Sequence, residues 1–356
     1  MGVQASNDVA KKFIGHKLII ANPLLAIEPI GDGSGAAVLY NPLTNKYYSS
    51  GYERHISAIA LCQQWTKSES YISNLSTKFE LDTYGCEKLF LELLEHSFLL
   101  YKLPEVESFL AKLDKNRKSL GDAAVLLHLN SNDYPFLDYG NPKTPLVDSA
   151  MMSLYSHVRK MPSSYRTYES DNEIKLEFPD RSEPITSDNS SDSLSTLGKL
   201  FWYSFGRIGR VVDPIQGELV LRTFPSGGSR HPVEMYFINR RLASVPQGIY
   251  HYNVQFHQLS KLSIDLDGLI DSSSDFQMVL TLSPARSMWR YREPRSSRVL
   301  FLDLGHAARN VERIFSDAGL CLSEVQMKAD SKLGELLGFE KFTEIPCVLY
   351  EGVWKK

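Results

Sequence analysis

Residues 222–232 read Arg-Thr-Phe-Pro-Ser-Gly-Gly-Ser-Arg-His-Pro and lead directly into the apolar run Val-Glu-Met-Tyr-Phe-Ile at 233–238. The segment Pro225–Gly228 predicts a turn, because proline, serine and glycine are residues that tight turns favour. Its two glycines have no Cβ atoms, so a flat ligand could reach the backbone within hydrogen-bonding distance. The β-branched and aromatic residues that follow predict a strand. The pattern indicates either an ordinary hairpin connection or the edge of a cofactor site.

The composition is that of a globular protein with a large core. The chain has 356 residues, of which 43% are hydrophobic and 23% are charged, and its formal net charge is −3. A chain of this length is expected to form two domains rather than one. Because the balance of charge is slightly acidic, nothing favours binding to a phosphate backbone, and nucleic acid is not expected as a partner.

The cysteines and the apolar runs bear on location. The four cysteines are far apart in the sequence, with no C-x-x-C pair and no histidine at zinc-ligand spacing. They predict reduced thiols in a reducing compartment and no metal site, and the cytoplasm fits best. No signal segment is recognisable and no apolar run approaches the length that spans a bilayer, so we expect neither export nor a membrane partner.

Residues 1–102 predict a winged-helix-like domain of short strands and three short helices. Strand-like runs lie around Leu18 and Tyr40, and apolar residues recur at helical spacing between Ile56 and Leu94, where Asp82 or Thr83 is placed to cap the third helix. DNA binding, capture of a peptide along a sheet edge, and a scaffold or dimerisation role are the alternatives. The first 100 residues carry eight Lys and Arg against ten Asp and Glu, a net of 8 − 10 = −2, which argues against DNA.

The rest of the chain divides into a connector and a larger domain. Residues 103–146 predict a helical connector that ends among turn-forming residues, and residues 147–356 form the second domain. Within it, the acidic, serine-rich stretch Glu169–Asp192 predicts a mobile surface loop, because it has too little apolar area to offset its ordering entropy.

A basic segment lies ahead of the helix-like run at 303–320. It contains Arg290, Arg292, Arg295 and Arg298 within nine residues. Arginine binds phosphate and carboxylate groups in bidentate fashion, so a phosphorylated cofactor, the acids of a partner subunit or an acidic substrate would each suit this segment. The plain alternative is a solvated charged loop.

Three motifs in order resemble those of the SagB/McbC-type dehydrogenases, which are FMN-dependent members of the nitroreductase superfamily. The motifs are Arg-x-x-Pro-Ser-Gly-Gly-x-x-x-Pro at 222–232, Gly-Ile-Tyr-His-Tyr at 248–252, and Asp-x-Gly-His-x-x-x-Asn at 303–310. The resemblance covers about Val147 to Trp354. It implies oxidation of azoline rings to thiazoles and oxazoles in a ribosomally synthesised peptide, with FMN as cofactor.

The resemblance also implies a cofactor site. Ser164 and Arg166 match the end of the superfamily's Arg-Arg-Ser-x-Arg motif, whose basic residues hold the FMN phosphate, but Pro162 and Ser163 replace its first two arginines. Phosphate binding would therefore depend on Arg166 and on later arginines such as Arg298. The loop beside the flavin ring corresponds to four residues, Pro225, Ser226, Gly227 and Gly228.

The chain departs from the family at the catalytic pair. The family's Lys-Tyr pair, which assists deprotonation of the azoline carbon, corresponds to Arg290-Tyr291 here. Arginine stays protonated at physiological pH, so Arg290 can orient or stabilise an anion but cannot act as a general base. Either Tyr291 takes that role, or the substrate differs, or activity is lost.

The fold implied by the resemblance is α+β, with a nitroreductase-like mixed, largely antiparallel sheet flanked by helices. Family members are homodimers with FMN at the subunit interface, and they act on a precursor peptide together with a cyclodehydratase. The alternatives are a nitroreductase-superfamily oxidoreductase with another substrate and a catalytically inactive, flavin-free scaffold for a peptide-modifying complex. In related systems a strand-and-helix lobe captures the leader part of the peptide, which makes residues 1–102 a candidate peptide-binding domain.

Overall fold

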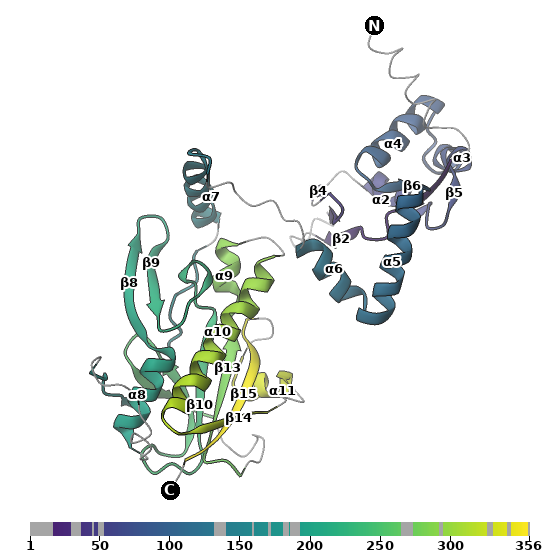
Figure 1. The fold of residues 1–356 in the computed structure, drawn as a ribbon. Coiled ribbons are helices and arrows are strands. Elements are labelled where there is room, and N and C mark those ends of the chain that lie inside the picture. Colours follow the sequence, from purple (N-terminus) through teal and green to yellow (C-terminus); the bar gives the residue numbers. More distant parts are fainter. Residues whose placement is uncertain are drawn as a thin grey trace. The chain divides into compact units, whose positions relative to one another are not determined.

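The computed structural model divides the chain into two compact units, Met1–Pro135 and Phe136–Lys356, called here the N-terminal unit and the C-terminal unit (Figure 1). It describes residues 17–29, 37–44, 46–48, 53–131, 140–158, 160–169, 172–180, 185, 193–264, 273–291, 295–325, 330–339 and 343–354. Within these ranges, no helix combines the length and the apolar character needed to cross a membrane.

The N-terminal unit contains the strand-and-helix arrangement that the sequence predicts. Its first sheet has the order β5-β1-β6, with antiparallel pairs on both sides of β1. The strands are β1 (Leu18–Ala21), β5 (Thr66–Lys67) and β6 (Leu99–Tyr101), and the helices packed with them are α2 (Glu53–Ala60), α3 (Ser68–Phe79) and α4 (Thr83–Glu95). Asp82 caps α4, because its Oδ1 accepts the backbone N–H of Gly85 at 2.8 Å.

The same unit holds a second sheet and two further helices. The sheet has the order β2-β3-β4, and its strands are β2 (Ala26–Pro29), β3 (Ala37–Asn41) and β4 (Lys46–Tyr48). The helices are α5 (Pro104–Leu120) and α6 (Asp122–Ser131). These two helices lie in the span predicted as a connector, and by their contacts they belong to the N-terminal unit.

A seven-stranded sheet forms the centre of the C-terminal unit. Its order is β14-β15-β13-β10-β11-β12-β7, and each of its described pairs is antiparallel. The strands are β7 (Glu173–Lys175), β10 (Val233–Asn239), β11 (Gly248–Asn253), β12 (Gln258–Lys261), β13 (Phe276–Leu282), β14 (Cys321–Val325) and β15 (Ile345–Val353).

Helices cover both faces of this sheet. All seven residues of β10 are buried, so its side chains alternate between two cores. Val233, Met235 and Phe237 pack in the cluster that includes residues of α8 (Leu194–Phe205) and α10 (Ser296–Asp317), whereas Tyr236 and Ile238 pack in the cluster that includes α11 (Asp330–Leu336). The predicted α+β class is confirmed. Gly206 follows α8 as its C-cap, and only glycine fits there, because a Cβ would lie 2.4 Å from the carbonyl oxygen of Trp202.

The prediction of a mobile loop over Glu169–Asp192 is wrong in part. Glu173–Lys175 forms β7, the edge strand beside β12, and Leu176 is buried in the core. This polar segment forms a strand because its backbone pairs with β12, which lies more than 80 positions later in the sequence. The pairing outweighs the preference of its local composition for a loop. Residues 170–171, 181–184 and 186–192 of this stretch lie outside the described residues.

Four further elements belong to the C-terminal unit. They are α7 (Thr144–Val158), the two-stranded hairpin of β8 (Arg207–Asp213) and β9 (Gly217–Arg222), and α9 (Pro284–Arg290). The glycine-containing turn that the sequence singles out is a short 3₁₀ segment, η2 (Gly227–Ser229), which lies between β9 and the central strand β10.

Candidate functional site

The glycine pair is required by close approach of the protein's own side chains. A Cβ on Gly227 would lie 2.5 Å from Cγ1 of Val299 in α10, and a Cβ on Gly228 would lie 2.5 Å from the hydroxyl oxygen of Tyr291. Gly228 also has a φ of +60°, and Ser229 and His231 adopt left-handed backbone conformations as well, with φ of 54° and 44°. Such conformations are costly for residues with a side chain, so the surrounding contacts must hold this turn in place.

Asp303 of α10 anchors the turn. Its Oδ2 accepts the Ser226 hydroxyl at 2.6 Å, and its Oδ1 accepts the Gly227 N–H at 3.0 Å. The Ser226 hydroxyl in turn accepts the backbone N–H of His231 at 2.8 Å. Asp303 is 2% exposed, and this burial raises its pKa. The sequence shows Asp303 as the first residue of a motif, but its contact with the turn was not predicted.

Tyr291 and Arg290, the predicted catalytic pair, lie at the end of α9 and have different surroundings. The hydroxyl of Tyr291 lies against Gly228, so the structure brings this tyrosine to the predicted flavin loop. Arg290 instead donates from Nη2 to both carboxylate oxygens of Asp148 in α7, at 2.8 and 2.7 Å, and its guanidinium lies 5.1 Å from the centre of the Tyr291 ring. Arg290 therefore connects α9 to α7 and supports the tyrosine from one side.

Buried N–H donors without partners lie close to this turn. Within the part of the chain that the structure describes, Nε and Nη2 of Arg222 and Nε of Arg230 have no hydrogen-bond partner, and both side chains are at most 7% exposed. A buried donor left unpaired costs about 1–3 kcal/mol, so such a group usually has a water or ligand acceptor. These donors fit a ligand rich in carbonyl and phosphate oxygens, as FMN is.

Burial also shifts the pKa values of the side chains near the turn. Burial lowers the pKa of Arg222 to about 10, so its guanidinium stays charged at neutral pH. Burial and the neighbouring Arg222 lower the pKa of His231 to about 2, which keeps its imidazole neutral. Burial also lowers the pKa of Arg230, against the effect of the nearby Tyr291 hydroxyl. The turn therefore has two buried cations and a neutral histidine near it, and the carboxylates of Glu234 and Asp213 act on Arg222 and Arg230 respectively.

The predicted phosphate-binding residues have partners of their own. Arg166 forms an ion pair through Nη1 with Glu344, and its Nε donates to the Tyr168 hydroxyl at 2.7 Å. The hydroxyl of Ser164 donates to the carbonyl oxygen of Glu218 at 3.2 Å. Arg298 is exposed in the first turn of α10, one residue before the Val299 that contacts Gly227.

Another arginine reaches the segment that lacks the family's arginines. Arg286 of α9, which sequence reasoning missed, donates from Nε to the carbonyl oxygen of Ser163 at 2.9 Å and forms an ion pair with Glu234 of β10. Glu234 also binds Nε2 of His251 at 2.9 Å. Burial opposes ionisation of Glu234, but Arg286 and His251 outweigh it and lower its pKa. No local pattern in the sequence marks Arg286, because its partners come from two distant segments.

Comparisons with known proteins identify relatives of the chain. No protein-family model matches it. It is 32% identical over 191 residues to the trifolitoxin-processing protein TfxB of Rhizobium leguminosarum bv. trifolii, a match that covers 50% of each chain. It is 25% identical over 144 residues to the nitroreductase candidate MJ1384 of Methanocaldococcus jannaschii, which covers 38% of this chain and 71% of that protein. The crystal structure of a nitroreductase candidate from Anabaena variabilis has 21% identity and a TM-score of 0.47, and the match covers 56% of this chain and 46% of that one.

The sequence matches confirm the resemblance that the motifs indicate, to nitroreductase-superfamily proteins of the SagB/McbC type. The chain spans half the length of TfxB.

Proposed function

We propose that this chain, a homologue of a trifolitoxin-processing protein and of a nitroreductase candidate, is an FMN-dependent dehydrogenase that oxidises azoline rings to azoles in a ribosomally synthesised peptide. The observation that carries the proposal is the contact of Tyr291 with Gly228, beside buried arginine donors that have no acceptor among the described residues. A tyrosine hydroxyl, a glycine turn and buried arginine N–H groups without a described acceptor together suit a reaction in which a flat, anionic cofactor meets a substrate that loses a proton.

Two groups of residues would hold the cofactor. The turn would lie beside the flavin ring, and the basic groups would bind its oxygens and its phosphate. These groups are Pro225, Ser226, Gly227 and Gly228 at the ring, and Ser164, Arg166, Arg222, Arg230, Arg286 and Arg298 at the anionic part. FMN, when bound, supplies an acceptor for the hydride that leaves the substrate carbon.

The protein's own part in the reaction is proton transfer and positioning. Tyr291 Oη is the proton-exchanging atom of the predicted pair, because the guanidinium of Arg290 is bound to Asp148. We assign Tyr291 the removal of the substrate proton and Arg290 the support of the tyrosine ring. Asp303 keeps the turn in the conformation that presents Gly228 to Tyr291.

The wider organisation is part of the proposal. Residues 1–102 would capture the precursor peptide and residues 147–356 would bind FMN. Residues 103–146 would be the connector between these two domains. The chain would act beside a cyclodehydratase that forms the azoline, as a cytoplasmic homodimer. Its exposed Phe301 and Leu302 on α10 are available for such an interface, at 62% and 61% exposed.

The experiment that tests the proposal combines a spectrum with a mass measurement. The purified protein should show flavin absorption and release FMN, and an azoline peptide should lose two hydrogens when dioxygen is present. Tyr291→Phe should abolish turnover and leave the flavin bound, since the hydroxyl transfers a proton and the ring only packs. Full activity of Tyr291→Phe would remove this residue from the mechanism.

The ion pair between Arg166 and Glu344 favours a second candidate, a flavin-free scaffold for a peptide-modifying complex. A basic residue already neutralised by a buried carboxylate is less available to a phosphate. Absence of flavin after purification, with partner binding unaffected by Arg166→Ala, would support the scaffold. Flavin in the protein but no reaction with azolines would instead indicate an oxidoreductase with another substrate.

A further inference from the structure

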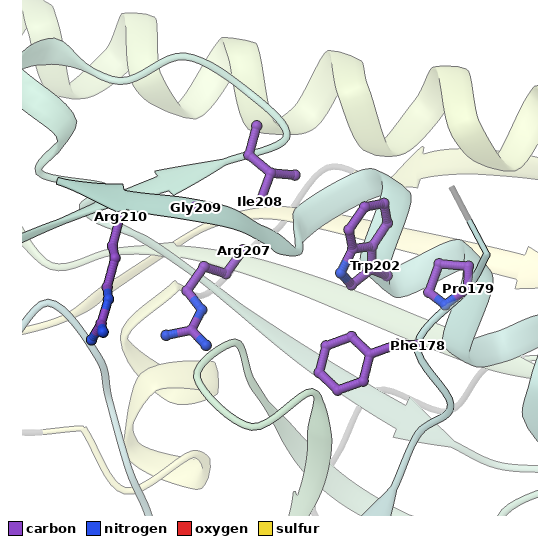
Figure 2. Close-up of a pocket in the computed structure, with 7 residues that line it drawn as sticks. All are labelled: Phe178, Pro179, Trp202, Arg207, Ile208, Gly209 and Arg210. Atoms are coloured by element: carbon purple, nitrogen blue, oxygen red, sulfur yellow. The ribbon is translucent and has the colours of Figure 1, made fainter. Parts of the chain in front are cut away.

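A pocket of about 570 Å³ lies beside the first residues of β8 (Figure 2). Its lining comes from three segments that are far apart in the sequence: the stretch after β7, helix α8 and strand β8. The lining residues are Phe178, Pro179, Trp202, Arg207, Ile208, Gly209 and Arg210. None of these residues is part of the proposed flavin site.

A β-bulge aims two arginines into this pocket. Residues three apart in a regular strand point to opposite faces, so Arg207 and Arg210 would normally diverge. The register between β8 and β9 shifts by one residue between Arg207 and Gly209, which inserts Ile208 as an extra residue. As a result both guanidinium groups extend to one side of the strand and Ile208 points to the other, as Figure 2 shows.

The pocket has two positively charged side chains and one carboxylate close to them. Glu218 binds Nη1 of Arg210 at 3.0 Å and accepts the Tyr165 hydroxyl at 2.5 Å, and these hydrogen bonds lower its pKa and keep it ionised. Arg207 makes one hydrogen bond to another described residue, from Nη1 to the Tyr165 hydroxyl at 3.2 Å, and no ion pair with a described carboxylate. Two guanidinium groups thus share one carboxylate, which leaves one positive charge for a ligand.

Aromatic side chains form the opposite wall. Trp202 is largely buried in α8, whereas Phe178 is 65% exposed and is held in place by ring contact with His257, with 4.8 Å between ring centres. A pocket with one unbalanced cation beside aromatic rings suits a carboxylate that adjoins an apolar or aromatic group.

The strand beside the pocket favours an extended peptide as the occupant. Strand β8 pairs with β9 alone in the described sheet, so its other edge exposes backbone N–H and C=O groups. Gly209 lines the pocket with backbone atoms alone, and the Cβ that it lacks would lie over Leu221 of β9. Extended peptides bind such edges by main-chain hydrogen bonds, and pockets for alternate side chains then give specificity.

We propose that this pocket binds an acidic residue of a peptide, with its carboxylate on Arg207 and a neighbouring apolar side chain between Phe178 and Trp202. The inference rests on the proposed function in taking the substrate to be a peptide, and it adds a selection for acidic sequence outside the reacting ring. It requires neither flavin nor turnover.

Binding of two labelled peptides to the full chain tests this assignment. The probes are fluorescein-labelled Gly-Ser-Glu-Phe-Glu-Ser-Gly and the same peptide with glutamine in place of both glutamates, measured by fluorescence anisotropy. The glutamate peptide should bind about tenfold more tightly, the size expected of one charged hydrogen-bonded pair. Arg207→Gln should remove this preference, and Arg241→Gln, at an exposed arginine elsewhere in the same unit, should keep it.

The aromatic wall has its own matched pair of variants. Phe178→Ala should weaken binding of both peptides severalfold, whereas Phe256→Ala, at a phenylalanine that is 56% exposed, should not. Equal binding of the two peptides by the unaltered chain, or an unchanged preference in Arg207→Gln, would overturn the assignment. Displacement of the glutamate peptide by free FMN would also overturn it, because the pocket would then hold cofactor. A colourless protein that still shows the Arg207-dependent preference would reject the proposed function and leave this inference standing.

Discussion

Replacement of Gly228 by alanine tests the geometry of the site, and the structure sets the size of the effect. The φ of +60° is strained for alanine and costs about 1 kcal/mol. The new Cβ would lie 2.5 Å from the Tyr291 hydroxyl, about 1 Å inside ordinary contact, so the tyrosine must turn away from its rotamer at a cost of about 0.5–1.5 kcal/mol. Gly228→Ala should therefore lower the free energy of unfolding by roughly 2 kcal/mol.

A second glycine separates the two contributions. Gly338 has a φ of +71° and no other atom within 4 Å of a Cβ built on it, so Gly338→Ala should show the backbone strain alone. Urea denaturation followed by tryptophan fluorescence measures both variants in the full chain, and Trp289 reports on the neighbourhood of α9. The difference between the two variants is the cost of the contact with Tyr291.

Removal of the tyrosine completes the test. In a Tyr291→Ala background, Gly228→Ala should cost only about as much as Gly338→Ala, which gives a coupling energy near 1 kcal/mol between the two positions. If Gly228→Ala costs no more than Gly338→Ala, or if Tyr291→Ala leaves its cost unchanged, then Tyr291 does not lie against the turn and the described site is wrong.

Three other predictions concern buried polar groups. Asp303→Ala should lower the free energy of unfolding by roughly 1–3 kcal/mol and weaken FMN binding, because the Gly227 N–H loses its acceptor; urea denaturation and a flavin titration check this. Burial lowers the pKa of His257 from 6.5 to about 4, so its contribution to stability is complete above pH 6.5 and is lost as pH falls toward 4. The free energy of unfolding should fall over this range by at most about 1.4 kcal/mol per pH unit. Urea denaturation at several pH values should show a weaker dependence of this free energy on pH in His257→Gln. Glu344→Gln should destabilise the fold by about 3 kcal/mol and lower the Kd for FMN, since Arg166 loses its carboxylate partner; an unchanged Kd would show that Arg166 does not contact the phosphate.

Local patterns predicted the elements of the fold well where one physical signal dominates. The β-branched run after the turn forms β10, and Asp82 caps α4 with its side chain. Each depends on residues only a few positions apart, which is the range over which propensity and capping act. Glu173–Lys175 could not be predicted in this way, because its strand exists through pairing with β12.

Sequence patterns indicated the central residues of the candidate site but not the residues that support them. The sequence indicated both Gly228 and Tyr291, but nothing in it indicated that they touch. The supports come from distant positions: Asp303 lies 77 residues from Ser226, and Asp148 lies 142 residues from Arg290. Arg290 illustrates the difficulty, because a basic run predicts an anionic partner without saying whether that partner is a ligand or a carboxylate of the same chain.

The central claim is that the turn at Gly228, with Tyr291 and the buried arginines near it, forms a flavin site. The most direct test is the visible absorption spectrum of the purified full chain before and after soaking with FMN, with the released chromophore identified by mass. We expect a yellow protein that releases FMN, and a Gly228→Ala variant with reduced flavin occupancy. A folded protein that stays colourless after soaking would contradict this claim.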